Sequence, residues 1–332
     1  MHHAFGFDTL FLSGNTFAEL AVSGWFEHQL SYHANAQKFI TQIIKFIDRH
    51  KSRKTFIYCH LNDLHEPIVL PESYNRVFGD LPNLKNLARW DFINGESIYG
   101  TEFEKYKETR IRLYDSAIYF VDQQVRTLAE YLRQESLWDK TILIVTADHG
   151  EEFWDHAETE KRIFFDPRDS FGIGHGHAPF QELIKVPLLI KAHGTKPNRI
   201  KTNCSLVDLA PTSLSMCGLK SEYQFNGSNI FETSEDRAIL CEESCYGYKK
   251  ESILYKQWKL IFSKCDGVEL LYDLSSDPKE QKNLSSQKVK KLEYLKSLLE
   301  LHFSESNKKY STEILDVDKR IAEHLKNMGY LD

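Results

Sequence analysis

Short apolar runs alternate along this chain with segments in which apolar residues recur every three or four positions. The runs lie at 7–12, 55–60, 141–146 and 186–191, and the helical periods lie at 35–49 and 105–135. Strands that alternate with helices are typical of a parallel sheet covered by helices. We therefore expect an α/β domain over residues 1–235.

The pattern changes in the last third of the chain. Four closely spaced strand candidates are followed by two charged helical segments: 238–242, 252–255, 258–263, 269–273, 286–304 and 312–328. Closely spaced strands without intervening helices favour antiparallel pairing. Residues 236–332 are thus predicted to form a small antiparallel α+β subdomain.

Composition excludes several classes of protein. A formal charge of −6 over 332 residues argues against nucleic acid as the partner. No apolar run approaches the roughly 18–20 residues that a membrane span requires. The printed start lacks the features of a signal peptide, and the six cysteines show no metal-site spacing. As it stands, the chain is expected to be cytoplasmic and reduced.

Asp148 and His149 follow directly on the strand-like run 141–146. Ligands of open α/β sheets bind outside the carboxyl ends of the strands, so these side chains are well placed for chemistry. A carboxylate oxygen beside an imidazole nitrogen would supply half of a divalent-cation site. The structural alternative is an aspartate that caps a turn beside a partly buried histidine.

Three further histidines are candidates for acid–base chemistry. His65 follows the run 55–60, while His175 and His177 lie in a glycine-rich segment, Gly172–His177. A histidine beside a leaving group can donate the proton that its departure requires. The glycines would let the backbone approach a ligand closely. Each histidine alone could equally be structural, but three such segments beside one aspartate favour a site.

Several motifs resemble the sulfatase family of the alkaline-phosphatase-like superfamily. They are HLNDLHEP from residue 60, TILIVTADHGEEFWDH from 141, GHGHAPFQELIKVPLLIKAHG from 174, SLVDLAPTSLSMCGL from 205 and ELLYDLSSDPKEQKNL from 269. The resemblance implies an alkaline-phosphatase/sulfatase-like α/β/α sandwich that hydrolyses sulfate esters of small molecules or glycans. The nearest alternative is hydrolysis of phosphodiesters or phosphonate monoesters by the same superfamily.

Carried over position by position, the resemblance assigns metal binding to Asp148 and His149. His65 becomes an active-site residue, His177 the basic residue before the Val-Pro strand, and His175 a second candidate for that role. The implied cofactor is a divalent metal ion, Ca²⁺ first, with Mg²⁺, Mn²⁺ or Zn²⁺ as alternatives.

The sequence departs from the family at the nucleophile. Family members carry a Cys or Ser in Cys/Ser-x-Pro-x-Arg, which becomes formylglycine, after a strand with two metal-binding aspartates. None of the six cysteines here is followed by x-Pro-x-Arg. The expectation is an N-terminally incomplete domain with half a metal site. The alternatives are a non-catalytic remnant, a homo-oligomer, or half of a two-chain assembly whose partner covers the missing segment.

Overall fold

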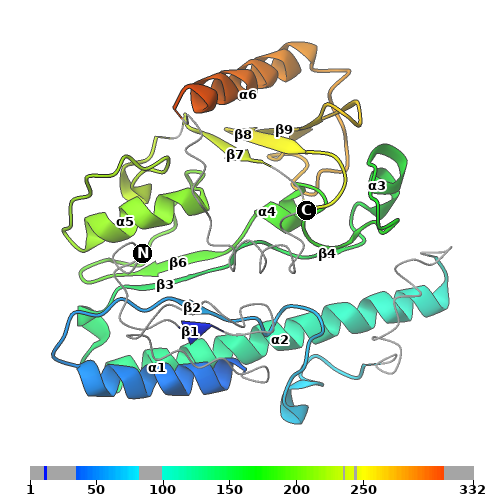
Figure 1. Cartoon of the computed structure of the whole chain (residues 1–332). Helices are drawn as coiled ribbons and strands as arrows, with labels where there is room; N and C mark the ends of the chain where they lie inside the picture. The colour runs from blue at the N-terminus through cyan, green and yellow to red at the C-terminus, as the bar shows by residue number, and fades with distance from the viewer. Residues whose placement is uncertain (1–10, 13–34, 82–98, 235, 243–244, 310–332) are drawn as a thin grey trace, which may run out of the picture. The chain divides into compact units, whose positions relative to one another are not determined.

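The computed structural model describes residues 11–12, 35–81, 99–234, 236–242 and 245–309, with side chains described up to residue 302. The chain divides into two compact units, 1–141 and 142–332 (Figure 1). The predicted domain boundary at 235/236 falls inside the second unit, just before an antiparallel sheet that begins at Ala238. Across the described residues, no helix has the length and apolarity needed to cross a membrane.

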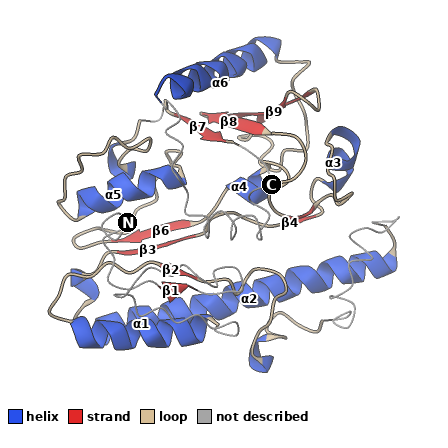
Figure 2. Ribbon diagram, in the orientation of Figure 1, coloured by secondary structure: helices blue, strands red, loops and turns tan. Residues whose placement is uncertain are grey.

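The first unit is built on two helices, α1 (Ala36–His50) and α2 (Thr101–Gln134), which pack together (Figure 2). Helix α1 confirms the predicted helical period, because its apolar positions fall on one buried face. Its first backbone N–H, on Ala36, donates to both carboxylate oxygens of Asp63, at 3.0 and 3.1 Å. This contact fastens the start of α1 to the segment that carries His65.

The strands of the first unit are short. Strand β1 (Phe11–Leu12) pairs in parallel with β2 (Cys59–His60), so only the end of the predicted run 55–60 is a strand. Residues 7–10 of the other predicted run lie outside the described part of the chain. A single-turn helix, η1 (Glu72–Tyr74), follows β2, and another, η4 (Trp138–Lys140), follows α2. The parallel pairing of β1 with β2 agrees with the predicted α/β pattern.

The second unit begins with β3 (Leu143–Thr146), which pairs with β6 (Leu188–Lys191). This pairing is antiparallel, whereas the alternation of strands and helices predicted parallel neighbours. A parallel neighbour needs a crossover, usually through a helix. The connecting segment instead forms short elements and returns to β3 from the opposite direction: β4 (Glu152–Phe153), α3 (Ala157–Ile163), β5 (Ile173–Gly174) and α4 (Gln181–Ile184).

A buried aspartate organises the segment after β6. This segment contains two single-turn helices and one α-helix: η5 (Leu206–Asp208), α5 (Leu209–Met216) and η6 (Ile230–Glu232). Asp208 accepts hydrogen bonds from the backbone N–H groups of Ser205 and Ser228, each at 2.8 Å, and pairs with Arg237 at 2.6 Å. One fully buried carboxylate therefore ties three stretches of chain together.

The C-terminal part is a four-stranded sheet with the predicted antiparallel pairing, and its strands lie in the order β10-β9-β8-β7. Its strands are β7 (Ala238–Cys241), β8 (Glu251–Tyr255), β9 (Trp258–Ser263) and β10 (Val268–Asp273). Helix α6 (Val289–Lys309) covers one face (Figure 1). The second helix predicted, 312–328, lies outside the described residues.

The alternation of side chains along β9 and β10 gives this sheet two apolar faces. Leu260 and Leu271 face α6, whereas Ile261 and Leu270 pack against Phe180 from the β3–β6 connection. The β3–β6 connection, which is largely irregular, therefore packs against one face of this sheet. This packing positions the segment that carries the candidate histidines.

Truncation of the α6 face should destabilise the second unit. Leu271→Ala is expected to lower the free energy of unfolding by about 2–5 kcal/mol, because Leu271 is fully buried. Urea unfolding followed by circular dichroism measures the change. Val289→Ala, at a position 54% exposed, is the matched control and should shift it by less than about 0.5 kcal/mol. Equal effects of the two substitutions would contradict the packing described.

Candidate active site

Asp148 and His149 lie just beyond the carboxyl end of β3, as the sequence predicted. The Asp148 carboxylate is exposed, and its Oδ2 lies 3.7 Å from Nε2 of His149. Nδ1 of His149 lies 2.8 Å from the carbonyl oxygen of Gly150, to which it donates. A neutral imidazole that donates through Nδ1 presents Nε2 as an acceptor. One carboxylate oxygen and one imidazole nitrogen thus stand side by side as donors for a cation.

Gly150 allows the chain to pass close to a neighbouring segment. Its N–H donates to the carbonyl oxygen of Leu183 at 2.8 Å, and a Cβ built on Gly150 would lie 1.8 Å from the carbonyl oxygen of Glu182. No larger residue fits without displacing this backbone. The residue after His149 therefore fixes the turn against the segment that follows the glycine-rich stretch.

His175 stacks on His149, with ring centroids 3.9 Å apart. Its Nδ1 pairs with Oε2 of Glu151 at 3.0 Å, and both side chains are partly exposed. The structure thereby brings together residues from two predicted segments, the end of β3 and the glycine-rich stretch. One ligand atom from each of His149, Glu151 and His175 lies within 4.8 Å of the others, so this trio could also hold a metal ion.

His177 occupies a different environment, since it is buried. Its Nε2 lies 2.9 Å from Oε2 of Glu152 and 3.3 Å from Oε1 of Glu160. Burial disfavours the charged imidazolium, but the hydrogen bonds and charges of the two glutamates outweigh that cost and raise the pKa of His177 to about 10. His177 is therefore a buried cation between two carboxylates.

The β4–β5 pair and Gly176 together place the two histidines in different surroundings. Glu151 and Glu152 are successive residues of an extended chain and point to opposite sides. His175 and His177 follow the end of β5, and Gly176 between them has a φ of +78°, so the extended alternation does not continue there. Glu151 and His175 meet on the partly exposed side, and Glu152 and His177 meet on the buried side. One histidine–glutamate pair therefore lies on each side of the β4–β5 pair.

His156, which the sequence analysis did not single out, lies in the same buried region. Its Nδ1 pairs with Oε1 of Glu182, its Nε2 donates to the carbonyl oxygen of Lys279 at 3.0 Å, and its ring stacks on Phe180 at 3.8 Å. Burial opposes its charge, but Glu182 prevails and raises the pKa of His156 to about 9. The signal available in the sequence was the excess of glutamates around it.

His65 belongs to the first unit, so the structure groups it with a different set of residues. Its Nδ1 donates to the carbonyl oxygen of Glu66 at 2.7 Å. Glu66 in turn pairs with Arg110 of α2 at 2.7 Å, and the Arg110 side chain is 5% exposed. Tyr106 accepts a second hydrogen bond from Arg110 at 3.0 Å. The segment that carries His65 is therefore anchored to α2 by a buried guanidinium.

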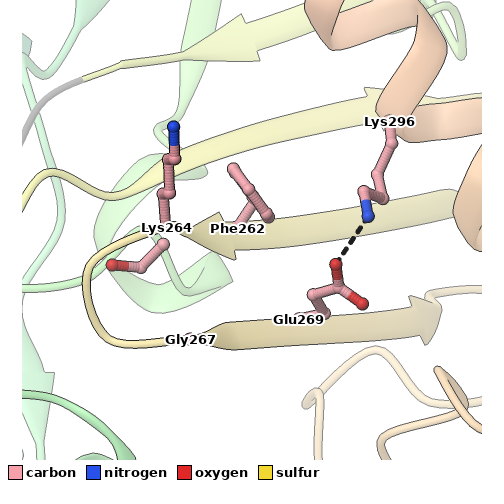
Figure 3. Close-up of a pocket in the computed structure, with 6 residues that line it drawn as sticks. Phe262, Lys264, Gly267, Glu269 and Lys296 are labelled. Carbon is pink, nitrogen blue, oxygen red and sulfur yellow. Dashed lines mark hydrogen bonds and ion pairs between the residues drawn. The ribbon is translucent and has the colours of Figure 1, made fainter.

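A hollow of about 440 Å³ lies at the β9–β10 hairpin and beside α6 (Figure 3). Lys296 crosses it to pair with Glu269 at 2.7 Å. The residues that line it are Phe262, Ser263, Lys264, Gly267, Glu269 and Lys296. None of these is a candidate of the sequence analysis, and the hollow holds no histidine. The candidate site is instead the His149–His175 region.

Comparisons with known proteins bear on the family of the chain. The family model described as Sulfatase matches residues 1–219. The chain is 27% identical over 181 residues to an uncharacterized sulfatase, YidJ, of Escherichia coli, covering 52% of this chain and 33% of that protein. It is 25% identical over 258 residues to an N-acetylglucosamine-6-O-sulfatase of Bacteroides thetaiotaomicron, covering 70% and 42%.

A solved structure shows the same fold. The putative sulfatase yidJ of Bacteroides fragilis superposes with a TM-score of 0.64 at 20% identity, covering 83% of this chain and 60% of that one. The alignments thus span 33% and 42% of the length of the two curated relatives. The likeness confirms the predicted fold class, an alkaline-phosphatase-like α/β architecture.

The buried histidines should make stability depend on pH. Their pKa values in the folded protein, about 10 for His177 and about 9 for His156, exceed the unfolded value of about 6.5. Their contribution is fully present below pH 6.5 and is lost as the pH rises toward 10. The urea midpoint should therefore fall over this range. The His177→Gln variant should be less stable at pH 7, and its urea midpoint should fall less steeply with pH than that of the wild type. An unchanged pH dependence of the midpoint would contradict the assignment of a charged, buried His177.

The Arg110–Glu66 pair should stabilise the first unit. Glu66→Gln is expected to lower the free energy of unfolding by about 1–3 kcal/mol, because it leaves a buried guanidinium without its counter-charge. Glu102→Gln removes an exposed pair with Lys105 and should change it by less than about 0.5 kcal/mol. Urea unfolding of both variants makes the comparison. A Glu66→Gln effect no larger than the control would show that the anchor is not energetically important.

Proposed function

The chain belongs to the sulfatase family, and from this premise we propose that it serves the hydrolysis of sulfate esters. The observation that carries the proposal is the contact between His149 and His175, which places a candidate proton donor beside a candidate metal ligand. Asp148 stands next to them with its carboxylate exposed. These residues would supply a metal ligand set in part and a proton donor, two of the functions that cleavage of an anionic ester requires.

The proton donor that we propose is His175. Hydrolysis adds water to the sulfate sulfur and breaks the ester S–O bond, so the alcohol oxygen must gain a proton as it leaves. His175 is partly exposed, and its Nδ1 is oriented by Glu151, an arrangement that fixes an imidazole for acid–base work. His177 is enclosed by Glu152 and Glu160 and is unsuited to reach a substrate. The active-site role of His65 stays a prediction from the resemblance.

The family generally binds a divalent metal, and the residues here fit one in chemistry. Asp148 offers a carboxylate oxygen, and His149 offers Nε2 because its Nδ1 donates to Gly150. We propose these two residues as ligands and calcium as the ion, with magnesium, manganese or zinc as the other outcomes. When bound, the cation would neutralise charge on the sulfate oxygens. The remaining ligands and the nucleophile stay predictions from the resemblance.

The proposed substrate is a sulfated glycan or a small sulfate ester. The support is the relative from Bacteroides thetaiotaomicron, whose name specifies N-acetylglucosamine-6-O-sulfate chemistry. The test uses protein isolated from its own cells, with its intact mass compared with 38.8 kDa. 4-Nitrophenyl sulfate, bis(4-nitrophenyl) phosphate and 4-nitrophenyl phenylphosphonate are assayed in parallel. Turnover of either phosphorus ester in preference to sulfate would overturn the proposal.

Replacement of the proposed donor should lower turnover. His175→Ala is expected to reduce kcat for 4-nitrophenyl sulfate by about 10²–10⁴-fold, the usual contribution of a general acid. His193→Ala changes an exposed histidine after β6 and is the matched control, with activity retained. Metal content by mass spectrometry should be unchanged in His175→Ala and lowered in Asp148→Asn. Full activity of His175→Ala would exclude it as the donor.

A further inference from the structure

We propose that His177, Glu152 and Glu160 form a buried positioning cluster that holds His175 against His149. The inference rests on the proposed function for its catalytic meaning, and on the packing of the second unit for its physical basis. All three side chains are at most 5% exposed. His177 thereby acts through His175 and does not itself meet the substrate.

Each glutamate is attached to the glycine-rich segment at a different point. Glu160 accepts the backbone N–H of Gly172 through Oε2 at 2.7 Å, and Glu152 pairs through its backbone with Gly174. His177 follows His175 by two residues and binds both carboxylates. The segment from Gly172 to His177 is thus held on both sides of His175.

The backbone at the first of these points has no room to shift. Gly172 has a φ of +75°, and a Cβ built there would lie 2.3 Å from Cβ of Ala157 at the start of α3. The backbone N–H of Trp154 also donates to the carbonyl oxygen of Gly172. Glu160 lies on the same helix, so α3 supplies both the steric limit and the anchoring carboxylate.

The charge of His177 is what makes this anchor stable. Burial, together with the charge of Glu160, raises the pKa of the Glu152 carboxyl to about 7, so two carboxylates side by side are costly here. The imidazolium between them offsets that cost. Oε1 of Glu152 also accepts the backbone N–H of His156 at 2.8 Å, so that carboxylate cannot turn away freely. Loss of the imidazolium would therefore push the glutamates apart and release the segment that they hold.

The test measures the chemical accessibility of His175 directly, without reliance on turnover. Full-length wild type, His177→Gln and His177→Lys are treated with diethyl pyrocarbonate, and modification of each histidine is followed by peptide mass spectrometry. His177→Gln should raise the rate at His175, relative to His193, by at least about threefold, because the segment opens locally. His177→Lys keeps the charge and should stay within about twofold of wild type.

A matched control removes a different buried ion pair from the same unit. Asp208 is fully buried and pairs with Arg237 at 2.6 Å, away from the β3–β6 connection. The double variant Arg237→Met with Asp208→Asn should leave the rate of His175 modification unchanged, provided that circular dichroism shows a folded protein. If the rate of His175 modification rises no more in His177→Gln than in this control, the proposal is overturned. Should His177→Gln not fold, Glu160→Gln takes its place with the same expectation.

Kinetics separate the two proposals. If wild type hydrolyses 4-nitrophenyl sulfate, His177→Gln should lower kcat with little change in KM, and His177→Lys should restore most of kcat. If wild type shows no turnover while the accessibility of His175 still rises in His177→Gln, the proposed function fails and the positioning cluster stands. Equal kcat values for wild type and His177→Gln in an active enzyme would exclude the positioning role.

Discussion

The second unit depends on the neutralisation of buried carboxylates. Glu152 and Glu160 are removed from water beside each other, and His177 stabilises them by supplying a positive charge and a hydrogen-bond donor between them. The same requirement recurs where His156 meets Glu182 and where Lys259 meets Glu280. These contacts give an irregular segment a defined conformation that hydrophobic packing alone would not specify.

Apolar packing supplies the complementary constraint. Phe180 lies between the stacked ring of His156 and the apolar side chains of β9 and β10, so polar and apolar contacts meet at one residue. The four-stranded sheet can support the β3–β6 connection because its strands have apolar side chains on both faces. The C-terminal sheet is therefore part of what positions the candidate site, although it lies far along the sequence.

Much of the architecture followed from local patterns. The helical period at 35–49 became α1 because its apolar residues repeat with the period of a helix, and the four late strands paired as expected from their close spacing. The antiparallel pairing of β3 with β6 was not predictable in this way. A strand's own sequence records its burial but not the direction of its neighbour, which depends on the path of the intervening chain.

By itself, the sequence determined which residue types could do chemistry and where the chain would present them: Asp148 and His149 after a strand, and two histidines among glycines. Only the tertiary structure distinguished the two histidines. His175 and His177 are two residues apart with similar neighbours in sequence, yet one stacks on His149 and the other is enclosed by glutamates. The reason is physical: an imidazole's role is set by its charge partners and its access to water, and distant segments supply both.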